Sequence, residues 1–431
     1  MGSNDSPTEN DSPSGIQEYW KIVQNFSPNA KLLLARGILG TFSGSIWGLI
    51  FNIYLLSLGF DKAFVGVMLS YDWFAHGALV IPAGIISDLF GRRRVYLIAF
   101  FVNMLIGFAM LFTVDMGWLL TLSALSGASA GFHAVTGRPF MLEVTEPEER
   151  MHLFTLSGSI RQITGAEGRI IAGVLPLLLA SYFGVDSLSP EPLRWALFCA
   201  VPLRILGLLP TYLIRERWQR QDVRTWITNL KSYSVLAKLT LTSGLSGLAA
   251  GLTWPFFNVF FFDRHGAEPL EFGLVFALTG VLTSFTTLLS PVFVQKIGRL
   301  NTIVFPAILS LPFLVIMPLS STFLLASLMY LLRGLVGSVS GPIEGLFTME
   351  LVGREERGTV EGVLHAVNEF PMGATARIAG PLMLSNLWGT QFGWAAGLML
   401  ASLVLFFIFF RPTKKSRHNP FPKGRGRGGL L

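Results

Sequence analysis

The chain has little charge for its length and a single cysteine. Only 14% of its 431 residues are Asp, Glu, Lys or Arg, whereas about a quarter is usual in soluble domains. The one cysteine, Cys199, excludes a disulfide within the chain and a cysteine-rich metal site. A mean hydropathy of +0.55, with 36 Phe and 10 Trp, excludes a disordered chain, a coiled coil and a secreted disulfide scaffold. A polytopic membrane protein remains.

Motifs of enzymes are also missing. The sequence contains no Gly-x-x-x-x-Gly-Lys-Ser/Thr phosphate loop, and its six His residues are scattered without a His/Glu metal motif. We therefore expect neither ATP hydrolysis by that route nor another enzymatic activity, and no cofactor or metal. The net charge of +7 does not indicate nucleic acid as a partner, because the basic residues are dispersed rather than gathered in one polar module.

Long apolar segments, separated by Gly, Pro or charged residues, fill most of the chain. A helix needs about 20 apolar residues to cross the hydrocarbon of a bilayer. The sequence therefore predicts an all-α membrane protein with twelve transmembrane helices, near residues 30–58, 62–87, 94–114, 117–143, 152–183, 192–214, 238–262, 270–294, 301–319, 322–348, 358–385 and 390–410.

The two ends of the chain differ from these segments. Residues 1–15 are polar and predict a disordered tail, residues 16–28 have the spacing of an interfacial amphipathic helix, and residues 412–431 form a basic tail. Most of the 33 Lys and Arg residues lie in these ends, in the linker 215–237, or in loops on the same side. The positive-inside rule predicts a multi-pass protein of the cell membrane with both termini in the cytoplasm.

The two halves of the chain repeat each other at a shift of 207 residues. The register continues without a gap from residue 31 to 175. Identical residues recur at this shift, among them Gly44 and Gly251, Trp47 and Trp254, and Gly91 and Gly298. An even number of spans returns the chain to its starting side. Residues 29–214 and 238–411 are therefore expected to be two six-helix bundles in the same orientation, joined by a cytoplasmic linker at 215–237.

One local motif lies between the second and third spans. The sequence there reads Gly84-Ile-Ile-Ser-Asp88-Leu-Phe-Gly91-Arg92-Arg93. Together with the two parallel halves, it resembles the loop signature of the major facilitator superfamily of transporters. A weaker copy, Gln295-Lys-Ile-Gly298-Arg299, lacks the first Gly and the Asp. The resemblance covers about residues 30 to 411 and implies two pseudo-symmetric bundles around a central cavity.

The resemblance also implies a conformational latch that holds the two halves together in the outward-facing state. Glu143 and Glu350 end apolar helices and, with the nearby arginines, resemble the charge-relay loops of the family. The alternative is that the basic residues only fix topology, but Asp88 adds nothing to that role. The latch candidates are Gly84, Asp88, Gly91, Arg92, Arg93, Glu143, Arg150, Gly298, Arg299, Glu350 and Arg357.

Ionisable side chains inside apolar spans are expensive and by default mark a pathway or relay. Here they avoid spans 3, 9 and 12, which the resemblance places at the lipid, and gather on spans that it places around the cavity. Paired Trp residues in spans 1 and 7 either line that cavity or simply pack. The substrate or cavity candidates are Arg36, Trp47, Arg138, Arg161, Trp254, Glu344, Asn368 and Arg377; Arg169 and Arg333 are further charges in these spans.

Two groups of acidic and histidine side chains have helical spacing. His365 and Glu369 share a face of span 11 with Glu361, and Asp72 shares a face of span 2 with His76. A buried carboxylate beside an imidazole suits reversible protonation. The proton-coupling candidates are therefore Asp72, His365 and Glu369.

The repeat also places two residues of spans 5 and 11 opposite each other. Arg161 is expected to face Glu369 across the pseudo-twofold axis, near the middle of the bilayer. Such a pair is either part of the mechanism or a static salt bridge, kept because either partner alone is costly.

These features predict a secondary active transporter that works by rocker-switch alternating access as a monomer, coupled to protons, with export preferred over import. An excess of Arg over acidic residues in the spans favours an anionic or zwitterionic substrate, and the aromatic residues favour an amphipathic one. Two alternatives stay open. One is a lipid or lysolipid transporter on the same fold, and the other is a membrane receptor or sensor that binds without transport.

Overall fold

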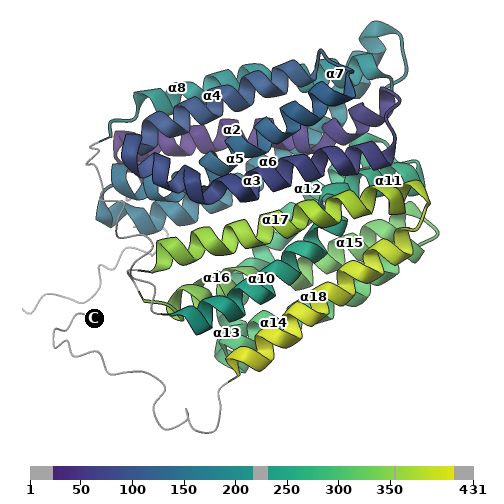
Figure 1. Ribbon diagram of the computed structural model, residues 1–431. Helices are drawn as coiled ribbons and strands as arrows, with labels where there is room; N and C mark the ends of the chain where they lie inside the picture. The colour runs from purple at the N-terminus through teal and green to yellow at the C-terminus, as the bar shows by residue number, and fades with distance from the viewer. Residues whose placement is uncertain (1–22, 217–231, 354–355, 412–431) are drawn as a thin grey trace, which may run out of the picture.

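A computed structural model describes residues 23–216, 232–353 and 356–411, and the regular elements of this part of the chain are helices (Figure 1). The expected disordered tail, most of the interfacial helix, most of the linker and the basic tail lie outside the described residues. The first half contains α2 (Pro28–Ser57), α3 (Lys62–Phe90), α4 (Arg92–Met110), α5 (Met116–Val144), α6 (Pro147–Phe183), α7 (Pro190–Phe198) and α8 (Ala200–Leu213).

The second half has more interruptions than the first. It contains α10 (Tyr233–Thr253), η1 (Trp254–Phe256), α11 (Phe257–His265), α12 (Pro269–Leu288), α13 (Ser290–Ile297), α14 (Arg299–Ile316), η2 (Met317–Leu319), α15 (Phe323–Gly337), α16 (Ser340–Glu350), α17 (Arg357–Leu384) and α18 (Trp388–Phe410). Spans 7 and 8 break next to Pro255 and Pro291, since proline has no N–H for the helical hydrogen bond.

Eleven helices or helix pairs of the described residues are long and apolar enough to cross a membrane. They match eleven of the predicted spans and confirm the all-α membrane fold class. The predicted span 358–385 corresponds to α17, which has the length but is less apolar, because it carries Glu361, Glu369 and Arg377. The expected count of twelve thus rests on the position and length of α17.

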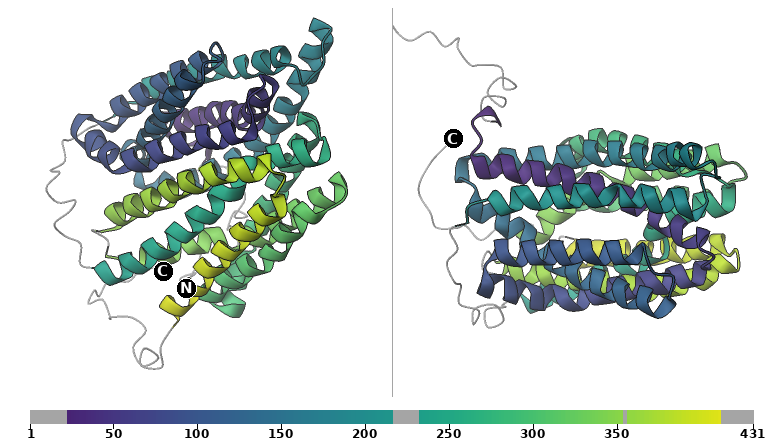
Figure 2. Two further views of the ribbon diagram at one scale, coloured as in Figure 1. Left: turned by 45° about the vertical axis from the view of Figure 1, so that its right-hand side comes forward. Right: turned by 90° about the horizontal axis from the view of Figure 1, so that it is seen from above.

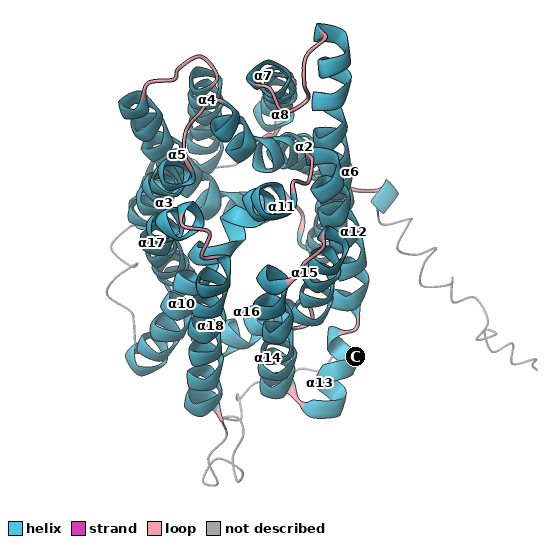
Figure 3. Ribbon diagram, turned by 90° about the vertical axis from the view of Figure 1, so that its right-hand side faces the viewer, coloured by secondary structure: helices cyan, strands magenta, loops and turns pink. Residues whose placement is uncertain are grey.

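The helices form two groups that lie side by side (Figures 2 and 3). Between the groups, α3 packs against α17 and α6 packs against α12, while α2 packs against α6 and α8, and α10 against α17 and α18. We call the face where α2 begins and α18 ends the terminal face, on the left of Figure 1, and the opposite one the distal face.

The two groups touch closely toward the distal face. Lys62 Nζ forms an ion pair with Asp263 Oδ1 at 2.8 Å, and Trp388 Nε1 donates to the other carboxylate oxygen. A Cβ on Gly66 would lie 2.7 Å from the carbonyl oxygen of Ala376, so α3 and α17 meet at their backbones and a larger residue has no room there.

On the terminal face, each group of helices contains its own copy of the same contacts. Arg92 Nη1 lies 2.9 Å from Glu143 Oε1, and Arg299, 207 residues later, pairs with Glu350. Arg150 donates to the carbonyl of Leu142, and Arg357 donates to the carbonyl of Met349, again at the same shift. Gly91 and Gly298 have φ of 95° and 82°, which explains the glycine at both turns. The sequence repeat is therefore also a repeat of structure.

Candidate functional site

A cavity of about 470 Å³ lies between the two groups of helices, and we call it the central cavity. Its lining comes from α2, α3 and α6 on one side and from η1, α11, α12 and α15 on the other, and includes Ser45, Trp73, Arg169, Trp254, Asn258 and Tyr330. Arg169 Nη1 donates to the carbonyl of Phe276 at 3.3 Å and forms no ion pair with the described residues. A cationic, aromatic cavity therefore sits where the two groups meet.

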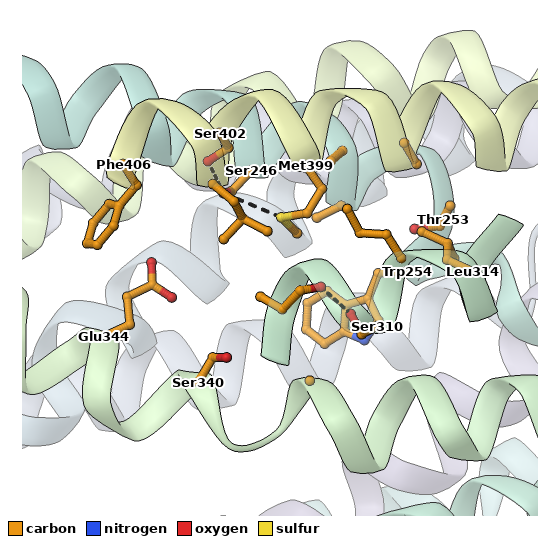
Figure 4. Close-up of a pocket in the computed structure, with 18 of the residues that line it drawn as sticks. Ser246, Thr253, Trp254, Ser310, Leu314, Ser340, Glu344, Met399, Ser402 and Phe406 are labelled. Atoms are coloured by element: carbon orange, nitrogen blue, oxygen red, sulfur yellow. Dashed lines mark hydrogen bonds between the residues drawn. The ribbon is translucent and has the colours of Figure 1, made fainter. Parts of the chain in front are cut away.

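A second cavity of about 520 Å³ lies inside the second group, and we call it the lateral cavity (Figure 4). It is lined by residues of α10, α14, α15, α16, α17 and α18, and it shares Trp254 with the central cavity. Trp254 is 63% exposed for this reason. Of the predicted substrate residues, Trp254, Glu344 and Asn368 thus line a cavity.

The lateral cavity contains one side chain of each charge. The Arg333 guanidinium lies 5.2 Å from the ring centroid of Phe257, and the Glu344 carboxylate points into the open space. Neither forms a hydrogen bond or ion pair with the part of the chain that the structure describes. Several hydroxyls around them are already bonded within the protein, for example Ser246 and Ser402 at 2.9 Å. The two charges are thus open to a ligand.

Asp72, His76, His365 and Glu369 come together where α3 meets α17, and we call them the acid–histidine cluster. His365 Nδ1 lies 4.0 Å from Glu369 Oε1, and the rings of His76 and His365 are 5.4 Å apart. The Asp72 carboxylate lies near the Ser126 hydroxyl and is near enough to Glu369 to interact with it electrostatically. The three proton-coupling candidates are therefore neighbours, and His76 joins them.

This cluster reaches the central cavity through stacked aromatic rings. His76 stacks on Trp73 at 5.9 Å, and Trp73 lies 6.4 Å from Trp254. Donor atoms of His76, His365 and Glu369 also lie within 4.8 Å of one another, a spacing at which these residues can share a proton or hold a metal ion. No sequence motif marked this grouping, because the residues come from helices about 290 positions apart in the sequence.

Two substrate candidates of span 1 pack inside the first group and are absent from the lining of both cavities. The Arg36 guanidinium lies 4.2 Å from the ring centroid of Tyr96. The Trp47 ring stacks on Phe51 at 4.6 Å, and the Arg204 guanidinium lies 5.1 Å from the centroid of the Trp47 ring. The cause is the orientation of α2, which turns this face toward α8 and α4. In this structure Trp47 therefore packs against its neighbours.

The expected ion pair between Arg161 and Glu369 is wrong for this conformation. Arg161 is exposed on α6, which packs against α2 and α12, whereas Glu369 is buried on α17, which packs against α3 and α10. Glu369 is paired instead with His365. Arg377 is likewise exposed and absent from the lining of both cavities. The side chain of Arg138 lies outside the description.

The latch candidates lie on the terminal face, and each of their contacts joins helices of one group. Arg92 binds both Asp88 and Glu143 at 2.9 Å, and the backbone N–H of Arg93 donates to Glu216. Gly84 is buried where α3 packs against its neighbours. Residues of the expected latch are thus assembled within each half, and the latch itself stays a prediction.

A family model described as the Major Facilitator Superfamily matches residues 32–232 and 239–430. The nucleoside transporter NupG has a similar structure, with a TM-score of 0.69 and 18% identity over 89% of this chain and 100% of that one. A bacterial homolog of the human lysosomal transporter Spinster, inward-facing and occupied, gives 0.71 and 12% over 90% and 97%. The D-xylose-proton symporter gives 0.67 and 15% over 92% and 98%. At these identities the likeness shows the fold alone.

Puromycin resistance protein pur8 of Streptomyces alboniger is similar in sequence to part of the chain. The two are 28% identical over 214 residues, which is 48% of this chain and 38% of that protein, so the match spans well under half of the relative. The family model, by contrast, covers both copies of the repeat, and the family is one of transporters. The resemblance carried by the loop motif is therefore confirmed: this multi-pass membrane protein belongs to the Major Facilitator Superfamily.

Proposed function

We propose that the chain is a secondary active transporter that moves a small amphipathic, anionic or zwitterionic organic molecule by rocker-switch alternating access. The observation that carries this proposal is the central cavity. It lies between two structurally repeated groups, and it holds Arg169 beside Trp73 and Trp254. A cation flanked by indole rings suits an anionic group attached to an apolar body. The two bundles, 29–214 and 238–411, move as units around it.

The contacts between the groups support a cavity that opens toward the terminal face. The Lys62–Asp263 ion pair and the close approach at Gly66 lie on the distal side, while the ion pairs of the terminal face stay within each group. Basic residues concentrate on the terminal side, which we assign to the cytoplasm, with the protein a monomer in the cell membrane. Opening to the outside then requires separation of Lys62 from Asp263.

Proton coupling is assigned to the acid–histidine cluster. Asp72 and His76 belong to the first half, and His365 and Glu369 to the second, so protonation changes the charge at the interface that moves. When both carboxylates are ionised they repel each other, and a proton on either one relieves this repulsion. Export is favoured over import by the partial similarity to a protein named for puromycin resistance.

The test is proton flux in liposomes that contain the full chain and a trapped pH-sensitive dye. A panel of organic anions, zwitterions and lysolipids is added under an imposed pH gradient, and at least one compound is expected to move protons. Glu369→Gln should abolish this flux without loss of folded protein, whereas Glu167→Gln, on an exposed position of α6, should retain it. Full pH-driven flux in Glu369→Gln removes the coupling proposal.

Two further outcomes separate the alternatives. Addition of EDTA should leave the flux unchanged; loss of flux on chelation would assign the cluster to a bound metal ion instead. Flux only with lysolipids would indicate a lipid transporter, and binding without flux of any compound would indicate a receptor.

A further inference from the structure

The lateral cavity occupies positions that the repeat fills with large side chains in the other half. The same interior positions carry different residues in the two copies. At the shift of 207, Arg36, Tyr96, Phe100, Asn103 and His133 correspond to Ser243, Ile303, Ala307, Ser310 and Ser340. All five residues of the second copy line the lateral cavity. The cavity therefore results from smaller side chains on a repeated backbone.

In the first half the large side chains fill this space. Tyr96 lies 4.1 Å from the ring of His133 and 4.2 Å beneath the Arg36 guanidinium, and Phe100 lies 5.2 Å from His133. Asn103 accepts a hydrogen bond from Arg204 at 3.2 Å. The interior of this group is thus a packed core that includes polar bonds.

In the second half, two positions of the same interior carry charged residues. Arg333 stands at the position of Ser126, and Glu344 at the position of Gly137. Both line the lateral cavity, and neither has a hydrogen-bond or ion-pair partner within the described residues. A charge inside a membrane bundle is costly unless something neutralises it. A ligand that carries both charges would neutralise the two residues together.

The lateral cavity is lined by apolar side chains as well as by hydroxyls. Arg333 on α15 and Glu344 on α16 are eleven residues apart, which corresponds to about 16 Å at the helical rise per residue, with a helix break between them. Met399 and Phe406 of α18, together with Trp254, form apolar parts of its wall (Figure 4). Such walls suit an apolar body between two charged ends.

We propose that the lateral cavity binds a zwitterionic amphipath, with its anionic group at Arg333, its cationic group at Glu344 and its apolar body between them. This inference deepens the proposed function and rests on it only for the role of the ligand as a substrate. Trp254 lines both this cavity and the central cavity, so the two sites are adjacent.

The test measures equilibrium binding to the purified full chain in nanodiscs. The probes are 8-aminooctanoic acid, octanoic acid and octylamine, which share an apolar chain and differ in charge. We expect 8-aminooctanoic acid to bind at least about tenfold more tightly than either probe with a single charge, because only it satisfies both side chains. Failure of all three probes to bind, or equal affinity for all three, overturns the proposal.

Two substitutions assign the two ends of the ligand. Glu344→Gln should weaken 8-aminooctanoic acid about tenfold, to the affinity of octanoic acid, and leave octanoic acid unchanged. Arg333→Gln should weaken both acids and leave octylamine unchanged. Glu167→Gln and Arg264→Gln, exposed on α6 and α11, are the matched controls. If either cavity variant weakens all three probes equally, the assignment is wrong.

Size-exclusion profiles and denaturation temperatures verify that the variants are folded. Since binding is measured without transport, binding with the expected charge dependence but no flux in liposomes would reject the proposed function alone. Flux without this charge dependence would reject the lateral site alone.

Discussion

Trp47 and Trp254 occupy the same position in the two copies of the repeat, yet they have opposite environments. Trp47 is packed between Phe51 and the Arg204 guanidinium inside the first group. Trp254 is 63% exposed and lies between two cavities. The helix layout was retained in both copies, and the volume of the surrounding side chains decided whether the interior became a core or a candidate binding site.

The backbone differs between the halves in the same region. Spans 1 and 4 are the continuous helices α2 and α5, whereas the equivalent spans 7 and 10 are interrupted at Trp254–Phe256 and between Gly337 and Ser340. The first interruption carries Trp254 into the cavities, and the second lies between Arg333 and Glu344. A helix break leaves backbone groups without helical hydrogen bonds and changes the direction of neighbouring side chains. Both of these breaks lie in the half that contains the lateral cavity.

The largest expected contrast concerns these two Trp residues. Trp47→Ala should lower the free energy of unfolding by about 3 kcal/mol, because it leaves a void beside Phe51 and Arg204. Trp254→Ala should lower it by less than about 1 kcal/mol, because its ring already faces open space. Denaturant unfolding of both variants in detergent tests this. Equal losses would contradict the contrast between a filled and a hollow half.

A second prediction concerns a variant in which a large side chain fills part of the lateral cavity in the second half. Ala307→Phe introduces the residue of the first half, Phe100, into the lateral cavity, and should weaken 8-aminooctanoic acid at least about tenfold while the protein stays folded. Leu309→Phe, on the exposed face of the same helix α14, is the control and should bind normally. Should Ala307→Phe fail to fold, Ser310→Asn makes the same test with a smaller change; unchanged affinity in the folded variant refutes the lateral site.

The smallest expected contrast concerns the ion pairs of the terminal face. Arg92 is largely buried between Asp88 and Glu143, whereas the Arg299 and Glu350 side chains are 52% and 48% exposed. Arg92→Gln should therefore lower the free energy of unfolding by about 1 kcal/mol. Arg299→Gln should lower it by less than about 0.5 kcal/mol, since solvent screens an exposed pair. Thermal denaturation at low and high salt compares them, and a larger loss for Arg299→Gln would reverse the ranking.

Patterns along single helices were predicted well from the sequence. The four-residue spacing of His365 and Glu369 placed them on one face of α17, and the motif from Gly84 to Arg93 placed Asp88 beside Arg92. Such contacts follow from helical geometry, which is the same in every fold.

Contacts between distant helices were predicted less well. Arg161 and Glu369 were expected to pair, but α6 packs against α12 and α17 against α3, so the two residues belong to different interfaces. His76 was noted only as a neighbour of Asp72, although it joins His365 across the two halves. The lateral cavity was not predicted, since side-chain sizes at a shift of 207 mean little until it is known which helix faces turn inward.

By itself the sequence determined the membrane as solvent, the positions of the spans, the duplication and the family motif, because these depend on local composition and periodicity. Tertiary structure alone decided that Trp47 packs while Trp254 is open, that Asp72 and Glu369 are neighbours, and that Arg333 and Glu344 share one cavity. The physical reason is that helix rotation and packing set which side chains meet, and residues far apart in the sequence make these choices together.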